Sequence, residues 1–314
     1  GLEGRVARLA DTAALDAALR DVRVVLHAAG PYYETAAPMV AACLRAGAHY
    51  LDITGEIPVI EALAARHAEA RRRGVMLMPA VGFDVVPTDC LAAHLAARLP
   101  SARRLVLAIQ GLRFATRASA KTAFHHAFDG VRVRRDGRVV IVPWGRFRRA
   151  FDWGDGPRES FAATWGDVGT AWYTTGIPDI TVYFEATAPL RMLDLAAQTM
   201  SWLFRTAPGQ AWLEAHADVL PDGPEPAERD AAGMVVLGEV EDAHGRRAVA
   251  RLRTPEAYAM TGLTGPAIAA RVLGGDLEPG FQTPGRVYGA DFVLGFPGVV
   301  REDLDDADAI THAT

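Results

Sequence analysis

Three short segments of the sequence place acidic or aromatic side chains beside a glycine, directly after an apolar run. They read AAGPYYET at 28–35, HYLDITGE at 49–56 and PAVGFDVVPTD at 79–89. An acid among apolar neighbours can keep its proton at neutral pH and donate it in a reaction. The three segments therefore offer candidate proton donors and candidate ligand contacts.

Asp84 is the first candidate for the proton donor. It lies between Phe83 and Val85, and helix capping explains it poorly. We predict that Asp84 is a general acid that also contacts the substrate. Asp89, farther along the same segment, is predicted to be an ordinary residue of a helix start.

The other two segments add candidate binding residues. Asp52 and Glu56 follow a buried strand, where an acid needs a partner or a ligand, so we predict that both contact the substrate. A local turn capped by Asp52 is the alternative. Gly30 lets a backbone approach a ligand closely. Tyr32 is a second candidate proton donor, and it is equally suited to be a packing ring.

The elements that must position these residues alternate between strand and helix up to residue 110. The patterns predict strands at 6–9, 22–29, 49–53, 75–79 and 103–110, and helices at 12–20, 36–46, 58–73 and 88–99. Asp11 is the expected cap of the first helix. The alternation predicts a parallel α/β sheet of the doubly wound kind, with a ligand crevice at the carboxyl ends of its strands.

Beyond residue 111 the pattern changes to hairpins and longer helices. Asp136-Gly137 is predicted to be a hairpin turn, and a second hairpin is expected over 234–253. Seven arginines of this part are predicted to form a solvated face, with binding of carboxylates or phosphates as the alternative: Arg132, Arg134, Arg135, Arg138, Arg146, Arg148 and Arg149.

The stretch 190–212 is predicted to be helical and amphipathic. We expect its large side chains Trp202, Phe204 and Trp212 to lie in the core. A membrane surface is the alternative environment for them.

The composition speaks against several classes of function. A net charge of -5 and a pI near 6.0 indicate no basic surface for nucleic acid. Cys43 and Cys90 are predicted to be reduced core residues, and the histidines show no spacing for a metal site. Since no apolar run is long enough to span a membrane, we expect a cytoplasmic protein.

Taken together, the segments at 24–56 and 75–96 resemble the saccharopine dehydrogenase-like family. They read VVLHAAGPYYETAAPMVAACLRAGAHYLDITGE and VMLMPAVGFDVVPTDCLAAHLA. Farther along, DVGTAWYTTGIPDITVYF and GFQTPGRVYGADFVL are similar to the branch of trans-acting enoyl reductases and saccharopine dehydrogenase-like oxidoreductases. The resemblance implies a Rossmann-like domain over 1–111, an inserted mixed α+β domain over 112–254, and helices over 255–314 that pack back on the first domain.

The resemblance also implies NADP or NAD as the cofactor. The residues implied to bind it are Asp11 near the adenine end, Ala29, Gly30, Pro31 and Tyr32 near the nicotinamide, and Gly82 and Phe83 in the loop that faces the substrate. In saccharopine-forming relatives this loop reads Gly-Leu-Asp-Pro-Gly. Here Gly82-Phe83-Asp84-Val85-Val86 keeps only the first glycine and the aspartate, which argues against an amino-acid substrate.

Members of this family begin with a strand, a Gly-x-x-Gly-x-x-Gly turn, a helix and a second strand. This chain aligns with the family only from the end of that region, so we expect an N-terminally truncated reductase whose first sheet strands are missing. Because the absent turn holds the cofactor pyrophosphate, we expect these 314 residues to be inactive by themselves.

The leading hypothesis for the parent protein is an NADP-dependent reductase. It would pass hydride to the C=C bond of an enoyl group or to a C=N bond of an apolar small molecule. The alternative is a non-catalytic protein that keeps the fold and contacts a lipid surface peripherally. A homodimer is a further expectation.

Overall fold

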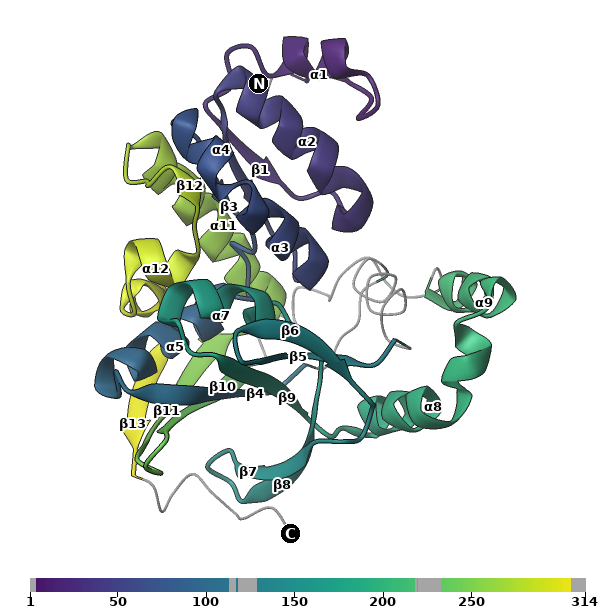
Figure 1. Ribbon diagram of the computed structural model, residues 1–314, viewed down its shortest axis with the longest axis vertical. Helices are drawn as coiled ribbons and strands as arrows, with labels where there is room; N and C mark the ends of the chain where they lie inside the picture. The colour runs from purple at the N-terminus through teal and green to yellow at the C-terminus, as the bar shows by residue number, and fades with distance from the viewer. Residues whose placement is uncertain (1–3, 113–116, 118–128, 218, 220–232, 306–314) are drawn as a thin grey trace.

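Two sheets organise the chain, one parallel and one mixed (Figure 1). The structure, a computed structural model, describes residues 4–112, 117, 129–217, 219 and 233–305. Sheet A has four parallel strands in the order β1 (Val24–His27), β2 (His49–Asp52), β3 (Met76–Met78) and β12 (Gly280–Phe281). Short apolar runs form these strands because helices cover both faces of the sheet.

The two faces of sheet A pack into different parts of the core. On β2, Tyr50 packs with α2 (Tyr32–Ala46) and α3 (Ile57–Ala65), while its neighbour Leu51 packs with α11 (Ala257–Leu273). Successive residues of a strand point to opposite faces, so α11 lies across the sheet from α2 and α3 (Figure 1). Of the smaller helices, α1 (Thr12–Ala18) contacts α2, and α4 (His67–Arg72) contacts β12.

Sheet B is a nine-stranded mixed sheet. Seven strands follow the order β13 (Val300–Leu304), β11 (Arg247–Pro255), β10 (Gly233–Asp242), β4 (Ala102–Gln110), β9 (Asp179–Glu185), β5 (Val131–Arg135) and β6 (Arg138–Val142). The hairpin of β7 (Arg148–Asp152) and β8 (Pro157–Ala162) joins at β9.

A helical layer lies between the two sheets (Figure 1). It consists of α5 (Val86–Arg98), α7 (Asp167–Thr175) and α12 (Pro284–Tyr288), followed by the 3-10 helix η1 (Phe292–Gly295). Two further helices, α8 (Ala188–Phe204) and α9 (Ala207–Ala217), project from the side of sheet B. The layer matters for function because it brings parts of the second sheet's region to the carboxyl edge of sheet A.

This architecture confirms the predicted fold class, a Rossmann-like parallel sheet with a mixed α+β part. The domain limits at 111 and 254 stay a prediction. One strand was assigned to the wrong sheet, because β4 pairs with β10 and β9 in sheet B. Its apolar run suits a central strand of either sheet, so the sequence pattern could not choose between them.

Three other expected elements differ in the structure. Residues 6–9 form no strand, and Val6 is fully exposed, because they pair with no other strand in the described chain. The helix expected over 58–73 is divided at Arg66 into α3 and α4. The helix expected to begin at residue 36 begins at Tyr32, directly after Pro31, which leaves Pro38 inside it.

Both predicted hairpins are confirmed. Asp136 and Gly137 take positive φ angles in the turn between β5 and β6, and β10 pairs with β11 as the second hairpin. The arginines of the first hairpin do not form one solvated face, because Arg134 is buried. Its guanidinium donates to a carbonyl group of α7 and pairs with Glu61 of α3. These contacts offset the cost of removing its charge from water.

The large side chains of α8 and α9 are not in the core, contrary to expectation. Trp202 is 73% exposed and Trp212 is 53% exposed, and only Phe204 is partly buried. The reason is that α8 buries its opposite side, around Asp194 and Ala197, against the rest of the chain.

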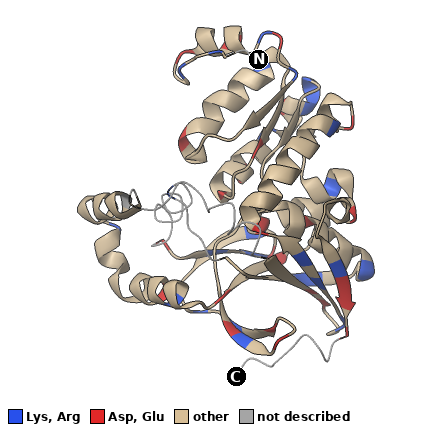
Figure 2. Cartoon of the chain, turned by 180° about the vertical axis from the view of Figure 1, so that it is seen from behind, with Lys and Arg blue, Asp and Glu red and all other residues tan. Residues whose placement is uncertain are grey.

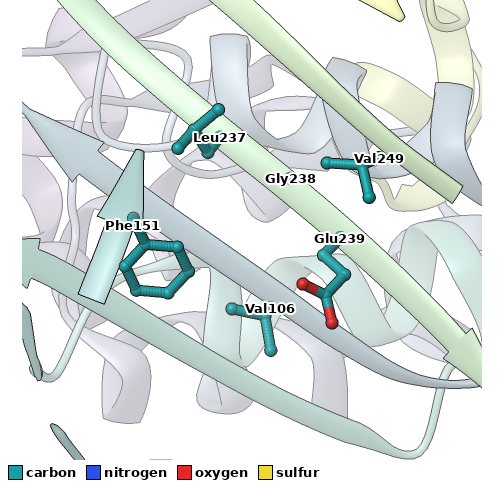
Figure 3. A pocket seen from close by; sticks show the side chains of 6 residues that line it. All are labelled: Val106, Phe151, Leu237, Gly238, Glu239 and Val249. Atoms are coloured by element: carbon teal, nitrogen blue, oxygen red, sulfur yellow. The ribbon is translucent and has the colours of Figure 1, made fainter. Parts of the chain in front are cut away.

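A small internal cavity lies on the side of sheet B that faces β7 (Figure 3). Its volume is about 10 Å³, and it is lined by Val106, Phe151, Leu237, Gly238, Glu239 and Val249. A cavity of this size holds about one water molecule. It is therefore too small for a substrate or a cofactor.

Candidate active site

The candidate site is the carboxyl edge of sheet A, where three loops meet. Parallel strands all end at this edge, so β1, β2 and β3 bring residues 28–31, 53–56 and 79–85 together. Hydrogen bonds fasten the loops to one another. The Tyr32 N–H donates to Glu56 Oε1 at 3.0 Å, and the Ala80 N–H donates to Asp52 Oδ1 at 2.9 Å.

Asp52 joins the ends of β2 and β3. It is fully buried, and its Oδ1 also accepts the Thr54 N–H at 3.0 Å. Burial raises the pKa of this carboxyl to about 6, against the lowering effect of the two backbone N–H groups. Asp52 thus holds the third loop, in which Ala80 takes a left-handed conformation with φ +60°.

Glu56 links the first loop to the second. It is 4% exposed, precedes α3 as the N-cap residue, and accepts the Tyr32 N–H. The predicted substrate contacts of Asp52 and Glu56 stay predictions. In this structure Asp52 Oδ1 and Glu56 Oε1 accept hydrogen bonds from backbone N–H groups of the crevice loops.

Tyr32 lies at the start of α2 with its ring against His27. Its hydroxyl donates to the His27 carbonyl at 3.2 Å. Burial raises the pKa of the phenol well above its usual range, and the nearby carboxylates Asp52 and Asp84 raise it further. Tyr32 therefore keeps its proton at neutral pH and can donate a hydrogen bond but resists ionisation.

Asp84 lies in the third loop beside the second. A Cβ atom added to Gly55 would lie 2.7 Å from Asp84 Oδ2, so this carboxylate rests directly on the Gly55 backbone. Burial alone raises the pKa of Asp84 to about 7. Its side chain accepts no hydrogen bond from the described residues and is partly open to solvent.

Gly82 and Phe83, in the same loop, are covered by α11. The Phe83 N–H donates to Thr261 Oγ1 at 3.0 Å, and a Cβ atom at Gly82 would lie 3.0 Å from Thr261 Cγ2. Phe83 is part of the core. Both residues are buried, so Asp84 is the side chain of this loop that is partly open to solvent.

The first loop leaves its backbone accessible. Ala28, Ala29 and Gly30 are exposed and small, so a ligand can approach their backbone at the end of β1. Thr35 Oγ1 donates to the Ala29 carbonyl at 2.8 Å and fixes the loop to α2. The predicted placement of these residues at the nicotinamide end of NAD(P) stays a prediction.

Asp11 is placed as a helix cap rather than as a free carboxylate. As predicted, it is the N-cap of α1, and its Oδ1 accepts the Ala14 N–H at 3.0 Å. The residue is exposed, so its predicted contact with the cofactor stays a prediction.

Two buried acids of the site were not predicted from the sequence. Asp89 is not an ordinary helix-start residue: it is fully buried, accepts the Thr174 hydroxyl at 2.6 Å and the Gly285 N–H at 2.7 Å, and has its pKa raised by burial to about 6. Asp167, in the first turn of α7, is also fully buried, and neither of its carboxylate oxygens has a hydrogen-bond partner in the described chain.

Asp167 and Asp84 belong to one electrostatic group. Burial raises the pKa of Asp167 well above its usual range, and the negative charges of Asp89 and Asp84 add to that rise. The nearby Thr88 hydroxyl lowers the pKa somewhat, but it donates its hydrogen bond to the Val85 carbonyl at 2.9 Å. Thus the crevice contains two carboxyl groups, Asp84 and Asp167, whose pKa burial raises above the usual range.

The described residues contain no group of three or more histidine, cysteine or acidic side chains that could hold a metal ion. Likewise, no helix in the described ranges is long and apolar enough to cross a membrane.

Comparison with known proteins finds its match in the part of the chain that forms the crevice. Residues 4–78, which contain β1, β2 and β3, match the family model of the saccharopine dehydrogenase NADP binding domain. Similar curated proteins include the trans-acting enoyl reductase of Mycobacterium ulcerans, 35% identical over 91 residues, and the saccharopine dehydrogenase-like oxidoreductase of Homo sapiens, 35% identical over 82 residues. These matches cover 29% and 26% of this chain, and only 22% and 19% of the two relatives.

Two solved structures share the whole fold at low identity. The first is the apo saccharopine dehydrogenase (L-Glu forming) of Saccharomyces cerevisiae, with a TM-score of 0.60 and 12% identity, covering 95% of this chain and 88% of that one. The second is the homospermidine synthase of Legionella pneumophila in complex with NAD, with a TM-score of 0.55 and 9% identity, covering 93% of this chain and 78% of that one. Residues 4–78 are thus similar to the NADP-binding domain of saccharopine dehydrogenase-like oxidoreductases. The chain as a whole shares the fold of the two solved structures.

Proposed function

We propose that the protein is an NAD(P)-dependent reductase that delivers hydride to a C=C or C=N bond of an apolar substrate. Asp84 carries this proposal, because it is an unpaired carboxyl with a pKa of about 7 at the carboxyl edge of an NADP-binding sheet. A reduced nicotinamide supplies the hydride when it is bound. Asp84 supplies the proton that completes the reduction.

The other residues of the crevice position the reactants. Ala29 and Gly30 present a small, exposed backbone to the cofactor, and the half-buried Pro31 follows them. Tyr32 donates a hydrogen bond from a phenol that stays protonated. Asp52 and Glu56 hold the three loops at fixed distances, so that the proton donor and the cofactor keep their relative placement.

Three of the seven arginines of the second part support an apolar substrate over a dicarboxylic one. Arg134 pairs with Glu61, Arg148 pairs with Asp194 and Glu159, and Arg149 pairs with Glu239. A guanidinium that already has a carboxylate partner is not free to clamp a substrate carboxylate.

The test is NADPH consumption by the full-length natural protein with a long-chain enoyl thioester. Asp84→Asn keeps the shape of the side chain and removes the transferable proton, so turnover should fall by about 100-fold or more. Asp155→Asn, at an exposed acid far from the crevice, is the matched control and should leave turnover unchanged. Unchanged turnover in Asp84→Asn would remove the proposed role, and reduction of a dicarboxylic imine alone would remove the apolar substrate.

A second candidate function, contact with a lipid surface, is favoured by the outer side of α8 and α9. Met192, Leu195 and Leu203 lie on one side of α8 at helical spacing and are exposed, as are the indoles Trp202 and Trp212. Both helices are mostly free of charged residues in Figure 2. Arg191 and Arg205 flank the apolar stripe but pair with Glu159 and Asp129, so the exposed apolar side chains carry this candidate.

Co-sedimentation with vesicles of anionic phospholipid tests this candidate. The natural protein should pellet with the vesicles, and the double substitution Trp202→Ser with Leu203→Ser should release it. Ile141→Ser, which removes an exposed apolar side chain from β6, is the control and should not. Light scattering of the free protein tests the alternative that the same helices form a homodimer. In that case the natural protein would be dimeric, the double variant would be monomeric, and neither would pellet with the vesicles.

A further inference from the structure

A second cavity lies beside β12, the outer strand of sheet A on the side opposite to β1 and its crevice loop. Its volume is about 360 Å³, and it opens between α4, the segment before β12, and α12. It is lined by His67, Arg71, Glu278, Pro279, Gln282 and Arg286. Since β12 and β1 are the two outer strands of the sheet, this cavity is separate from the proposed cofactor site.

The charged side chains of this cavity come from three different segments. Arg71 belongs to α4 and Arg286 to α12, and both are exposed. Within the described ranges, neither guanidinium pairs with a carboxylate, and Glu278 lines the same cavity without an ion pair to either. Two cationic groups and one anionic group thus face a shared space without neutralising one another.

Neutral groups of the cavity add both kinds of hydrogen-bonding capacity. His67 Nδ1 accepts the Phe281 N–H at 3.2 Å, so the neutral ring carries its proton on Nε2 and can donate it. Gln282 is 3% exposed, and its Oε1 has no hydrogen-bond partner. Its Nε2 reaches only the Pro279 carbonyl, at a long 3.4 Å. A buried amide with such weak bonding can turn to accept a donor from a ligand.

The backbone is shaped to keep these groups together. Gly280 has φ +106°, and a Cβ atom there would lie 2.8 Å from Arg71 Cγ and 2.8 Å from His67 Cε1. Only glycine therefore allows α4 to lie this close to β12. The positions of Arg71 and His67 against the strand follow from that contact.

We propose that this cavity binds a small zwitterion, a molecule that carries a carboxylate or phosphate group and an ammonium group. Arg71 and Arg286 hold the anionic group, because a guanidinium donates two parallel hydrogen bonds to an oxyanion. Glu278 and Gln282 Oε1 accept hydrogen bonds from the ammonium group. The proposal is independent of the proposed reductase activity, since no crevice residue takes part in it.

Calorimetric titration of the full-length natural protein tests the site. The probes are L-alanine and phosphoethanolamine as zwitterions, and acetate and inorganic phosphate as matched anions without the ammonium group. At least one zwitterion should bind saturably and about tenfold or more tighter than its matched anion. Phosphoethanolamine binding without L-alanine binding would identify phosphate as the anionic group.

Two variants and one control assign the contacts. Arg71→Gln with Arg286→Gln should weaken zwitterion binding by at least about tenfold, and Glu278→Gln should remove only the preference for the zwitterion over the anion. Arg72→Gln, an exposed neighbour on α4 that does not line the cavity, should change nothing. All four positions are exposed, so folding is expected to persist, and melting curves check it. The proposal fails if no probe binds, or if the arginine variants bind as the natural protein does.

Discussion

The buried acids of the crevice differ in the hydrogen bonds that they accept. Asp52 accepts two backbone N–H groups, and Asp89 accepts one N–H group and one hydroxyl. Asp84 and Asp167 accept none from the described residues. Hydrogen bonds to a carboxylate stabilise its charged form. Accordingly, burial raises the pKa of Asp84 to about 7, above the value of about 6 for Asp52 and Asp89, and it raises the pKa of Asp167 well above its usual range.

The role of Asp84 predicts a pH dependence of turnover. A general acid must be protonated, and the pKa of Asp84 is about 7. The rate of enoyl thioester reduction should therefore fall as the pH rises through about 7, and a profile from pH 5 to 9 measures it. In Asp84→Asn the remaining rate should show no such fall, and a fall that persists in the variant would assign the titration to another group.

Asp167 predicts a pH-dependent change in stability. Its pKa is raised in the folded state above the ordinary value of 3.8, so the folded protein binds the proton more tightly than the unfolded chain does. Its contribution to stability is therefore lost as the pH rises above about 4. In Asp167→Asn this loss is absent. The melting temperature of the variant minus that of the natural protein should therefore be higher at pH 8 than at pH 4, by about 2–4 °C or more.

Thermal unfolding followed by circular dichroism at pH 4, 6 and 8 measures this difference. The control is Asp291→Asn, at a 78% exposed carboxylate that pairs with Arg301. It should show no comparable gain toward pH 8. A constant offset between Asp167→Asn and the natural protein at all three pH values would contradict the buried titration.

At the scale of elements, α7 closes over the crevice because two glycines leave room for it. A Cβ atom at Gly166 would lie 2.8 Å from Val85 Cγ2 and 3.6 Å from Gly55 Cα. The start of α7 thus rests on the second and third loops. This contact brings Asp167 near Asp84 although the two residues are far apart in the sequence.

Gly166→Ala should destabilise the protein by about 1–3 kcal/mol, because the added methyl group meets a well-packed side chain. Gly262→Ala is the matched control within α11, where an added Cβ atom would have no neighbour within 4 Å. That substitution should stabilise the helix slightly, by up to about 1 kcal/mol. Urea denaturation measures both, and equal effects of the two substitutions would show that α7 does not press on the loops.

Arg134 joins three elements at one point. Its Nε donates to the Val168 carbonyl at 2.8 Å, its Nη1 donates to the Gly137 carbonyl at 2.8 Å, and its Nη2 pairs with Glu61. Arg134→Met removes all three contacts, takes the arginine donor away from the two carbonyl groups, and leaves Glu61 with the Tyr173 hydroxyl as its donor. The free energy of unfolding should fall by about 3 kcal/mol.

Arg138→Met on the same hairpin is the control for that experiment, because Arg138 is exposed. Its effect should stay within about 0.5 kcal/mol. Similar losses for the two substitutions in urea denaturation would mean that the hairpin, rather than the buried contacts of Arg134, determines the result.

At the scale of the whole molecule, one apolar core connects the two sheets. It contains Leu51 and Met78 of sheet A together with Leu107 and Val236 of sheet B, bridged by Leu91 of α5. A shared core of this kind favours unfolding of both sheets in a single step.

Urea denaturation can test this, because all six tryptophans lie between residues 144 and 212 and none is in sheet A. Tryptophan fluorescence therefore follows the region of sheet B, whereas far-UV circular dichroism follows both sheets. The two transitions should have the same midpoint. An early circular dichroism transition, before fluorescence changes, would show that sheet A unfolds by itself.

Local patterns in the sequence were sufficient for much of the crevice. Strands β1, β2 and β3 are short apolar runs followed by glycine or proline, and these signals depend only on neighbouring residues. The position of Asp84 at a strand end followed from them, because all parallel strands of one sheet end at the same edge. The two hairpins and the cap of α1 by Asp11 were predictable for the same reason.

The tertiary structure alone decided which of these groups are buried, and beside what. Nothing near Asp167 in the sequence indicates that it lies beside Asp84, because that proximity results from the packing of α7 on two loops. The exposure of Trp202 was equally undetermined, since an amphipathic helix has the same periodicity whether its apolar side meets a core or the outside. Periodicity specifies which side chains share a face, and only the packing of distant elements specifies what covers that face.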